Sequence, residues 1–325
     1  MKLATLENAT RDGRLAVVST DLRQAIDAAD IAPTLLDAIE RWAQVEGPLR
    51  ARARALASGN AAGAFAFDPK SAMSPLPRSY QWLDGSTFSN HGSLMERAFD
   101  LGIVNEYEKY PLVYQGASDD FIGPCDDVCL PSEADNMDFE GEVAVVVDEV
   151  PMGTNQQSAA AHIKLIMLVN DVSLRAHAAR EMKTGFGWVQ AKPSTAFSPV
   201  AVTPDELGEA WQGGRVNLPL RVQRSGEWFG HPNGSEMTFN FFRLIEHTAY
   251  SRRLRAGTIL GSGTVSNAAR TAGSACIAER RAIEVIEHGA AKTPFLRFGE
   301  RVRVEMLDSQ GHSIFGAIDQ RYVQS

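Results

Sequence analysis

The chain has 325 residues, with 40 acidic against 32 basic side chains and a formal net charge of -8. This balance argues against nucleic acid or an anionic membrane as the main partner, because either would need a basic surface to neutralise its phosphates. No apolar run approaches the roughly 20 residues that cross a bilayer, and the N-terminal segment lacks the apolar stretch of a signal peptide. The 3 cysteines are too few for a disulfide framework and indicate a reducing compartment, so we predict a cytoplasmic protein.

Residues 1–75 are predicted to form a small α/β domain of their own. Apolar patterning predicts a strand over residues 15–19 and helices over residues 31–45 and 49–67. A proline-dense segment follows, and such segments commonly link elements. We therefore expect a second domain over residues 76–325.

The second domain is predicted to be α+β and β-dominated, with a few covering helices. Short β-rich runs separated by turn signals recur at residues 142–147, 198–202, 218–222, 258–260, 301–306 and 314–318. Helical spacing predicts helices at residues 156–168 and 239–249. No G-x-G-x-x-G motif follows a strand and opens a helix, which argues against a dinucleotide-binding fold.

Two glutamates at the mouth of a predicted strand are the most informative local feature. Glu140 and Glu142 are two positions apart, and residues i and i+2 of a strand project to the same face. Neighbouring carboxylates repel each other and favour a hard divalent cation with oxygen ligands between them. A solvated strand start with two surface glutamates is the alternative, and the motif alone leaves both open.

Two further segments place acids where they could take part in chemistry. Asp171 ends an apolar run predicted to be helical, so its carboxylate is expected to be partly buried and therefore paired, hydrogen-bonded or metal-bound. Asp84 precedes His91 by seven positions in a polar segment, and an imidazole exchanges protons near neutral pH. A helix cap or salt bridge also explains Asp171, and a lone histidine is more often structural than catalytic.

Taken in order, these pieces resemble the fumarylacetoacetate hydrolase family, in particular its bacterial fumarylacetoacetase-like members. The residues that match in order and local spacing are Asp84, His91, Glu140, Glu142, Asn170, Asp171 and Lys192. Each motif is unspecific by itself, whereas the ordered set is specific. The resemblance runs from about Ser79 to the C-terminus. It implies a mixed β-sandwich or roll as the catalytic domain, a small N-terminal domain, and a homodimer.

The resemblance also implies a role for individual residues. One divalent cation, Mg²⁺ or Ca²⁺, would be held by Asp84, Glu140, Glu142 and Asp171. The implied catalytic residues are His91 as general base, Glu279 as the residue that orients it, and Lys192. Contacts to the substrate or its negative charge are implied for Tyr114, Thr258 and Arg175.

Three positions depart from the family pattern, and all three concern substrate recognition. Ser86 stands where the animal enzyme has a substrate-binding tyrosine, and Ala178 stands where a glutamine would follow Asp171. Asp100 stands where an arginine would follow His91. The metal and base positions therefore match better than the positions that choose the substrate.

The implied reaction is hydrolysis of a carbon–carbon bond in a β-diketone acid of the fumarylacetoacetate or acylpyruvate type, as in aromatic amino-acid catabolism. A divalent ion chelated by both diketone oxygens would stabilise the departing enolate. His91 would take a proton from water, and Lys192 would face an oxyanion or a substrate carboxylate. The expected partner is a small anionic diketo or oxo acid.

Two other functions stay open. A decarboxylase or an isomerase-hydratase acting on 2-oxo acids would keep the fold and the metal. The pair of Asp84 and His91 favours hydrolysis over these, because it supplies a base for water. A non-catalytic metal-binding scaffold would keep only the fold and the carboxylates.

Overall fold

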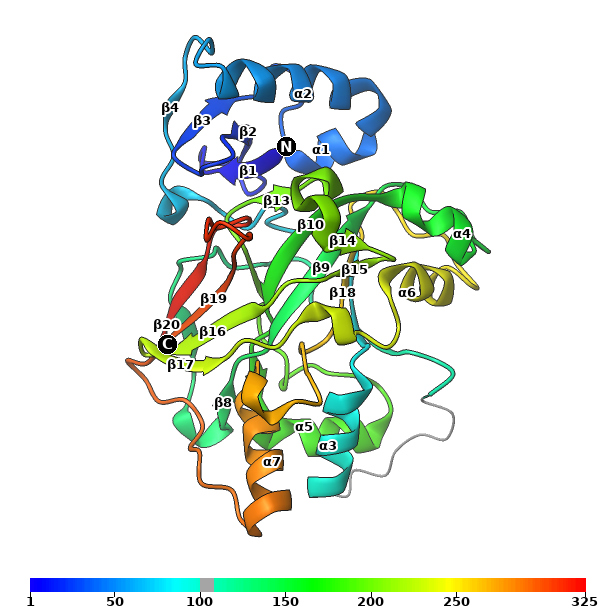
Figure 1. Cartoon of the computed structure of the whole chain (residues 1–325), viewed down its shortest axis with the longest axis vertical. Helices are drawn as coiled ribbons and strands as arrows, with labels where there is room; N and C mark the ends of the chain where they lie inside the picture. The colour runs from blue at the N-terminus through cyan, green and yellow to red at the C-terminus, as the bar shows by residue number, and fades with distance from the viewer. Residues whose placement is uncertain (100–107) are drawn as a thin grey trace.

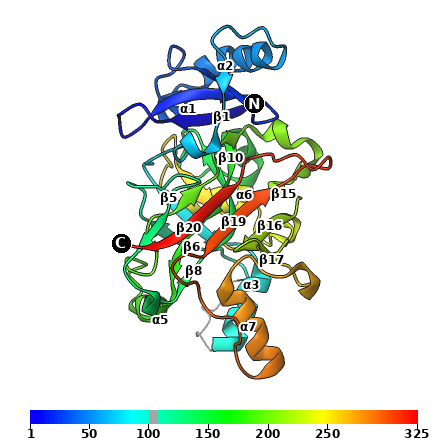
Figure 2. The same cartoon turned by 90° about the vertical axis from the view of Figure 1, so that its left-hand side faces the viewer.

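Two β-sheets packed against each other form the body of the protein (Figures 1 and 2). The structure, a computed structural model, describes residues 1–99 and 108–325. Asp100, one of the departures from the family pattern, lies outside the described residues.

The N-terminal residues form a layer of strands covered by two helices, at the top of Figure 1. The strands are β1 (Lys2–Leu6), β2 (Arg14–Val18), β3 (Gln24–Asp27) and β4 (Phe65–Ala66). The helices are α1 (Leu35–Glu40), which is capped by the Thr34 side chain, and α2 (Trp42–Ala57). The helix expected over residues 31–45 is interrupted at Arg41, where α1 ends and α2 begins. The helix expected over residues 49–67 ends earlier, because α2 stops before Gly59, a glycine in the left-handed region.

The larger sheet continues from this layer into the rest of the chain. Its further strands are β5 (Trp82–Ser86), β6 (Leu112–Gly116), β9 (Gly141–Val147), β10 (Ile163–Asn170), β12 (Ala196–Phe197), β13 (Ala201–Val202) and β18 (Ile259–Gly261). The strand order is β4-β3-β2-β1-β13-β10-β9-β18-β5-β6, and β12 pairs with β10. The N-terminal layer joins this sheet where β1 pairs with β13, with Lys2 opposite Val202.

The smaller sheet covers one face of the larger one. Its strands are β7 (Val128–Leu130), β16 (Leu220–Arg224), β17 (Glu227–Gly230), β19 (Arg301–Met306) and β20 (Ile318–Gln324), in the order β17-β16-β19-β20-β7. Leu168, Val222 and Val304 are fully buried in the core cluster that includes residues of both sheets. Full burial of each such side chain stabilises the fold by about 1.5–3 kcal/mol.

Helices and short strands complete the described part of the chain. The helices are α3 (Ser89–Phe99), α4 (Gln156–Ala159), α5 (Arg175–Thr184), α6 (Phe241–Thr248) and α7 (Ile277–His288). The short strands are β8 (Met137–Asp138), β11 (Ser173–Leu174), β14 (Trp211–Gln212) and β15 (Arg215–Val216). Helices α3 and α7 pack against each other at the end of the molecule opposite the N-terminal layer (Figure 1).

The helix expected over residues 156–168 is wrong. Only α4 and a 3₁₀ turn at Ala160–His162 are helical, and they are followed by the strand β10, which lies between β9 and β13. Apart from Lys164, every residue of β10 is buried, so both of its faces carry apolar side chains. A short apolar run of this kind does not distinguish a buried strand from a helix by its periodicity.

The other expected elements differ from the structure mainly at their ends. The strands expected at 142–147, 258–260 and 301–306 agree with β9, β18 and β19 to within one residue. The helix expected at 239–249 is α6, which begins after Asn240 because that side chain caps it. The strands expected at 198–202 and 314–318 are wrong over most of their length, because only residues 201–202 and 318 are in strands.

Candidate active site

Four acidic side chains, on or directly beside strands β5, β9 and β10, meet at one end of the larger sheet. Asp84, Glu140, Glu142 and Asp171 are all buried, and each contributes an oxygen to a group that lies within 4.8 Å of one another. Strand pairing explains the arrangement: Glu142 of β9 is opposite Val169 of β10, and the Asp171 backbone N–H donates to the Glu140 carbonyl. The expected i, i+2 projection of the two glutamates therefore brings them to this group.

Asp84 reaches the group across strand β18, which has a glycine at the crossing point. Gly261 pairs with both Asp84 of β5 and Ala144 of β9. A Cβ on Gly261 would clash with Asp84 Oδ1 and with the Trp82 ring. Any other residue there would displace Asp84, so a glycine at this position allows the Asp84 side chain to reach the other three acids.

Glu142 supports the fit of a divalent cation most directly. Within residues 1–99 and 108–325, no basic, hydroxyl or backbone group donates a hydrogen bond to either of its buried oxygens, and the polar side chain nearest in its effect is another acid, Asp84. A buried carboxylate without a partner is strongly unfavourable, and it becomes favourable beside a bound cation. Hard divalent cations prefer such oxygen-only shells, so the residues present fit a divalent metal.

Burial and mutual repulsion change how these acids ionise. Burial raises the pKa of Asp84 well above its ordinary value, and the neighbouring Asp171 carboxylate raises it further. The pKa of Glu142 is also raised well above the ordinary value, by burial first and then by Asp84 and Asp171. A metal therefore competes with protons for these oxygens, and its binding should strengthen as the pH rises.

Lys192 contributes a positive charge to this group. Its Nζ donates to Glu140 Oε2 at 2.6 Å and to Asp171 Oδ2 at 2.5 Å. Burial alone would lower the pKa of Lys192, but the Asp171 and Glu140 carboxylates outweigh it and raise the pKa above its ordinary value. The lysine therefore remains charged and can face an anionic substrate.

Arg175 holds Glu140 from the opposite side. Its Nη2 donates to Glu140 Oε1 at 2.6 Å, and its Nε donates to Asp138 Oδ2 at 2.8 Å. Burial would raise the pKa of Glu140, but the positive charges of Lys192 and Arg175 hold it well below its ordinary range. Glu140 is thus the permanently charged member of the group.

His91 and Glu279 form a hydrogen-bonded pair beside the carboxylates. His91 Nδ1 lies 2.8 Å from Glu279 Oε2, and the Glu279 side chain is only 1% exposed. His91 lies in α3 and Glu279 in the first turn of α7, so the packing of these helices brings together residues far apart in the sequence (Figure 1). His91 is near enough to Glu140 that an imidazolium there would help to lower the pKa of that carboxyl, after Lys192 and Arg175.

Tyr114 adds a hydroxyl to the group. It lies on β6 opposite Asp84, and its Oη donates to Asp171 Oδ2 at 2.5 Å. Burial and then the Asp171 carboxylate raise the pKa of Tyr114 well above its ordinary value, so the phenol keeps its proton. The Trp188 ring meets the Tyr114 ring edge-on, with 6.4 Å between centroids.

Thr258 is the one predicted site residue that the structure does not bring to the carboxylates. Because β18 runs antiparallel to β9, Thr258 lies next to Val147, at the end of β9 away from Glu142. The predicted substrate contact is therefore corrected. Thr264 lies nearer to the carboxylates than Thr258 does. The backbone N–H groups of Ser262 and Val265, on either side of Thr264, donate to the carbonyls of Val143 and Gly141, which flank Glu142.

Sequence reasoning also missed two residues that support the site. Asp138 is fully buried and accepts from Arg175 Nε. Thr195 donates through Oγ1 to Asp171 Oδ1 at 2.8 Å. Asp138 had a signal, because it stands two positions before Glu140 in the same alternating run. Thr195 had no such signal in the sequence, because its contact with Asp171 arises only in the tertiary structure.

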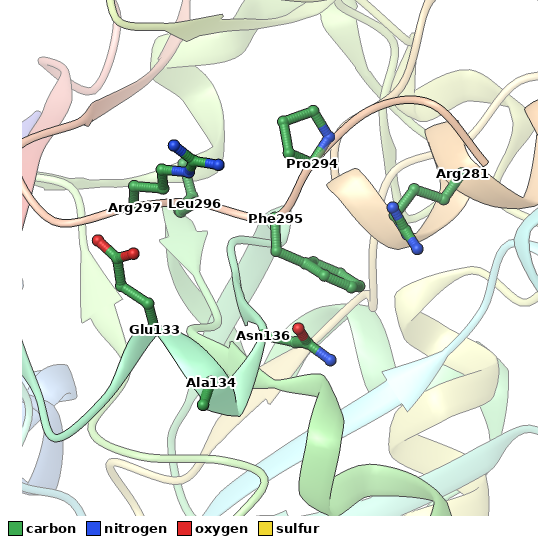
Figure 3. Close-up of a pocket in the computed structure, with 8 residues that line it drawn as sticks. All are labelled: Glu133, Ala134, Asn136, Arg281, Pro294, Phe295, Leu296 and Arg297. Carbon is green, nitrogen blue, oxygen red and sulfur yellow. The ribbon is translucent and has the colours of Figure 1, made fainter.

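A surface pocket of about 470 Å³ lies apart from these residues (Figure 3). In the view, Arg281 and Arg297 stand on opposite sides of Phe295. None of the ten predicted site residues lines it. The remaining lining residues are Glu133, Ala134, Asn136, Pro294 and Leu296.

Fold and site together describe a two-sheet protein with a buried carboxylate group beside a histidine–glutamate pair. Residues 82–322 match the family described as Fumarylacetoacetate (FAA) hydrolase C-terminal, and residues 1–78 match Fumarylacetoacetase N-terminal domain 2. The chain therefore belongs to the fumarylacetoacetate hydrolase family, and the resemblance inferred from the ordered motifs is confirmed, as is the β-dominated α+β fold.

Named relatives carry more than one activity. A 2,4-didehydro-3-deoxy-L-rhamnonate hydrolase of Sphingomonas sp. (strain SKA58) is 29% identical over 157 residues, 47% of this chain and 52% of that protein. A mitochondrial oxaloacetate tautomerase of Rattus norvegicus is 28% identical over 159 residues, 48% of each chain. The chain thus spans about half the length of the curated relatives it matches.

Solved structures share the fold over the whole chain. Maleylpyruvate hydrolase from Sphingobium sp. SYK-6, in complex with manganese(II) ion and pyruvate, superposes with a TM-score of 0.67 at 16% identity, covering 100% of both chains. A 5-carboxymethyl-2-hydroxymuconate delta-isomerase from Mycobacterium smegmatis gives a TM-score of 0.62 at 16% identity, covering 100% of this chain and 99% of that one. Along the described residues, no helix is long and apolar enough to span a membrane.

Proposed function

We propose that the chain is a divalent-metal-dependent hydrolase that cleaves a carbon–carbon bond in a β-diketone acid of the fumarylacetoacetate or acylpyruvate type. One observation carries the proposal: the buried group of four carboxylates lies beside the hydrogen-bonded pair of His91 and Glu279. A base for water and a site for a cation are the two parts that this reaction needs.

The metal ligands in this proposal are Asp84, Glu140, Glu142 and Asp171. A bound divalent ion supplies Lewis-acid stabilisation of the negative charge that develops on the substrate oxygens. The all-oxygen ligand set suits Mg²⁺ or Ca²⁺, and we propose one of these as the cofactor. Mn²⁺, the ion present in the maleylpyruvate hydrolase complex, is a suitable probe.

His91 is the proposed base. When its Nδ1–H donates to Glu279 Oε2, its Nε2 is left as the acceptor for a proton from water. The water oxygen then bonds to the carbonyl carbon, and the bond to the neighbouring carbon breaks. The electron pair leaves with that carbon as an enolate, which takes a proton back from His91. Lys192 and Arg175 provide positive charge for the anionic substrate.

The test of His91 is a pair of matched histidine variants. His91→Ala should lower kcat on an acylpyruvate by about 10²–10⁴-fold, because general-base catalysis is lost. His162 also pairs through Nδ1 with a carboxylate, Asp148 at 2.7 Å, but lies outside the site, so His162→Ala should keep full activity. Equal turnover of His91→Ala and the wild type would remove His91 from the mechanism.

A second candidate is tautomerisation or isomerisation of a 2-oxo acid, and the oxaloacetate tautomerase among the relatives favours it. His91 would then move a proton between carbon and oxygen of the substrate without attack by water. Product analysis separates the reactions: hydrolysis yields two organic products, tautomerisation leaves the carbon skeleton intact, and decarboxylation releases carbon dioxide. Treatment with EDTA followed by metal addition should abolish and restore the activity.

A non-catalytic scaffold predicts metal binding without turnover of any of these acids. Three further implications of the resemblance stay predictions: a homodimer, a small anionic oxo or diketo acid as partner, and a cytoplasmic location.

A further inference from the structure

Asp138 is a buried carboxylate that the proposed reaction does not use. It has no exposed surface, and four groups donate to it. Its Oδ1 accepts from the backbone N–H of Phe139 and of Ile277, each at 2.8 Å. Its Oδ2 accepts from the backbone N–H of Ala278 at 2.9 Å and from Arg175 Nε at 2.8 Å.

Through Arg175, Asp138 is linked to the proposed metal ligands. One guanidinium spans both acids, with Nε on Asp138 and Nη2 on Glu140 Oε1. A planar guanidinium that donates to two carboxylates fixes their separation more tightly than a single ion pair would. The position of Arg175 beside Glu140 therefore depends on Asp138.

Through α7, Asp138 is linked to the proposed base. Ile277 and Ala278 are the first two residues of this helix, so Asp138 holds its N-terminus. The next residue is Glu279, whose Oε2 holds His91 Nδ1. The groups that Asp138 anchors are thus directly followed in the chain by the residue that orients His91.

We propose that Asp138 is a positioning residue, which sets the location of the pair of His91 and Glu279 relative to the four carboxylates. This inference rests on the proposed function for its effect on turnover, but not for its effect on His91 itself. In Asp138→Asn, an amide NH₂ must replace one of the two acceptor oxygens, so donors meet donors at one edge of the side chain. Either the first turn of α7 or the Arg175 guanidinium must then shift.

The experiment compares Asp138→Asn with a helix cap that lies away from the site. Thr34 caps α1 by accepting from the Asp37 backbone N–H at 3.1 Å, so Thr34→Ala is the matched control. The readout is the nuclear magnetic resonance signal of the proton on His91 Nδ1 in metal-free protein, assigned by its loss in His91→Ala. A second readout is the binding of Mn²⁺ by titration calorimetry.

Asp138→Asn should move the His91 Nδ1 proton upfield or abolish its signal, because the bond to Glu279 lengthens. It should also weaken Mn²⁺ binding by about 10–100-fold, as loss of a residue that orients metal ligands does, and lower kcat more than it changes KM. Thr34→Ala should lower the unfolding midpoint by about 2–4 °C with none of these effects.

If Asp138→Asn lowers the midpoint but leaves the His91 signal and Mn²⁺ affinity unchanged, Asp138 is only a helix cap and the proposal is overturned. A shifted His91 signal in a protein that turns over none of the acids would support the positioning role and overturn the proposed function instead. Should Asp138→Asn not fold, Asp138→Glu tests the same link, because it keeps the charge and the acceptors but is one methylene longer. It should shift the same signal, and an unchanged signal would contradict the proposal.

Discussion

At Glu142, the requirements of metal binding conflict with the stability of the metal-free protein. Both of its oxygens are buried, and no basic, hydroxyl or backbone group of the described residues donates to them, whereas Glu140 is held by Lys192 and Arg175. Burial, and then Asp84 and Asp171, raise the pKa of Glu142 well above its ordinary value. Strained groups of this kind persist at functional sites because a ligand relieves them.

Replacing these two glutamates should therefore have opposite effects on the metal-free protein. Glu142→Gln should raise the free energy of unfolding by about 0.5–2 kcal/mol, whereas Glu140→Gln should lower it by about 3–5 kcal/mol. The loss arises because Lys192 and Arg175 each lose one of their two carboxylate partners in a buried site. Denaturant unfolding without metal checks both. The gain in Glu142→Gln should grow with pH, since a group with a raised pKa loses its contribution to stability as the pH rises through that pKa.

Metal binding should be lost in both variants. In the wild type, Mn²⁺ at 100 times its Kd should add about 2.7 kcal/mol to the free energy of unfolding, and neither variant should show this gain at the same concentration. A wild-type metal gain retained in Glu142→Gln would show that Glu142 is not a ligand.

At the scale of elements, the segment between α5 and Lys192 is hydrogen-bonded to a side chain of α5. Glu181 accepts from the backbone N–H of Val189, Gln190 and Ala191 at 2.8 to 3.0 Å. The tip of the segment is open to solvent, with Phe186 98% exposed. The position of Lys192 at the carboxylates therefore depends on one side chain that replaces missing backbone partners.

Glu181→Gln should loosen this segment and raise KM more than it lowers kcat, because Lys192 loses its fixed approach to the substrate. Burial would raise the pKa of Glu181, but the backbone N–H groups outweigh it and lower the pKa. Its contribution to stability is present above the ordinary carboxyl pKa of about 4.3 and is lost as the pH falls through the lowered value. Hydrogen exchange of residues 185–191 measures the loosening.

Glu284 provides the matched control for this prediction. It accepts from the backbone N–H of Lys292 and Thr293 in the same manner, at the end of α7 away from Glu279. Glu284→Gln should speed exchange there and leave KM unchanged. Identical KM values in Glu181→Gln and the wild type would contradict the assigned role of Glu181.

For the whole molecule, the N-terminal layer and the remainder share both a sheet and a core. β1 pairs with β13, and one buried cluster contains Leu3 and Leu15 together with Ile259 and Val146. Because the same apolar contacts stabilise both parts, we expect them to unfold together.

Calorimetric unfolding should accordingly show one transition for the full chain. Leu3→Ala, at the junction of the two parts, should lower the free energy of unfolding by about 2–5 kcal/mol and move that single transition as a whole. Two transitions, of which Leu3→Ala moves only one, would show that the N-terminal layer folds independently.

Sequence patterns predicted the site better than they predicted the elements that carry it. Residue types with specific chemistry, such as Glu140 and His91, keep their spacing within a family and can be recognised in order. The strand β10 could not be distinguished from a helix, because a run buried on both faces has no alternation. The place of Thr258 was predicted wrongly for a related reason. The antiparallel direction of β18 relative to β9 puts Thr258 beside Val147, and this direction cannot be inferred from the sequence of either strand.

The sequence by itself determined the family, because four carboxylates, a histidine and a lysine follow one another in an order that identifies it. Its acidic excess argues against phosphate-rich molecules as the main partners, and this stays a prediction. Only the tertiary structure decided which of those groups meet. Convergence of β5, β9 and the end of β10 buries Asp84, Glu142 and Asp171 together, and the packing of α3 on α7 joins His91 to Glu279. Such contacts depend on strand order and helix packing, which local patterns do not encode.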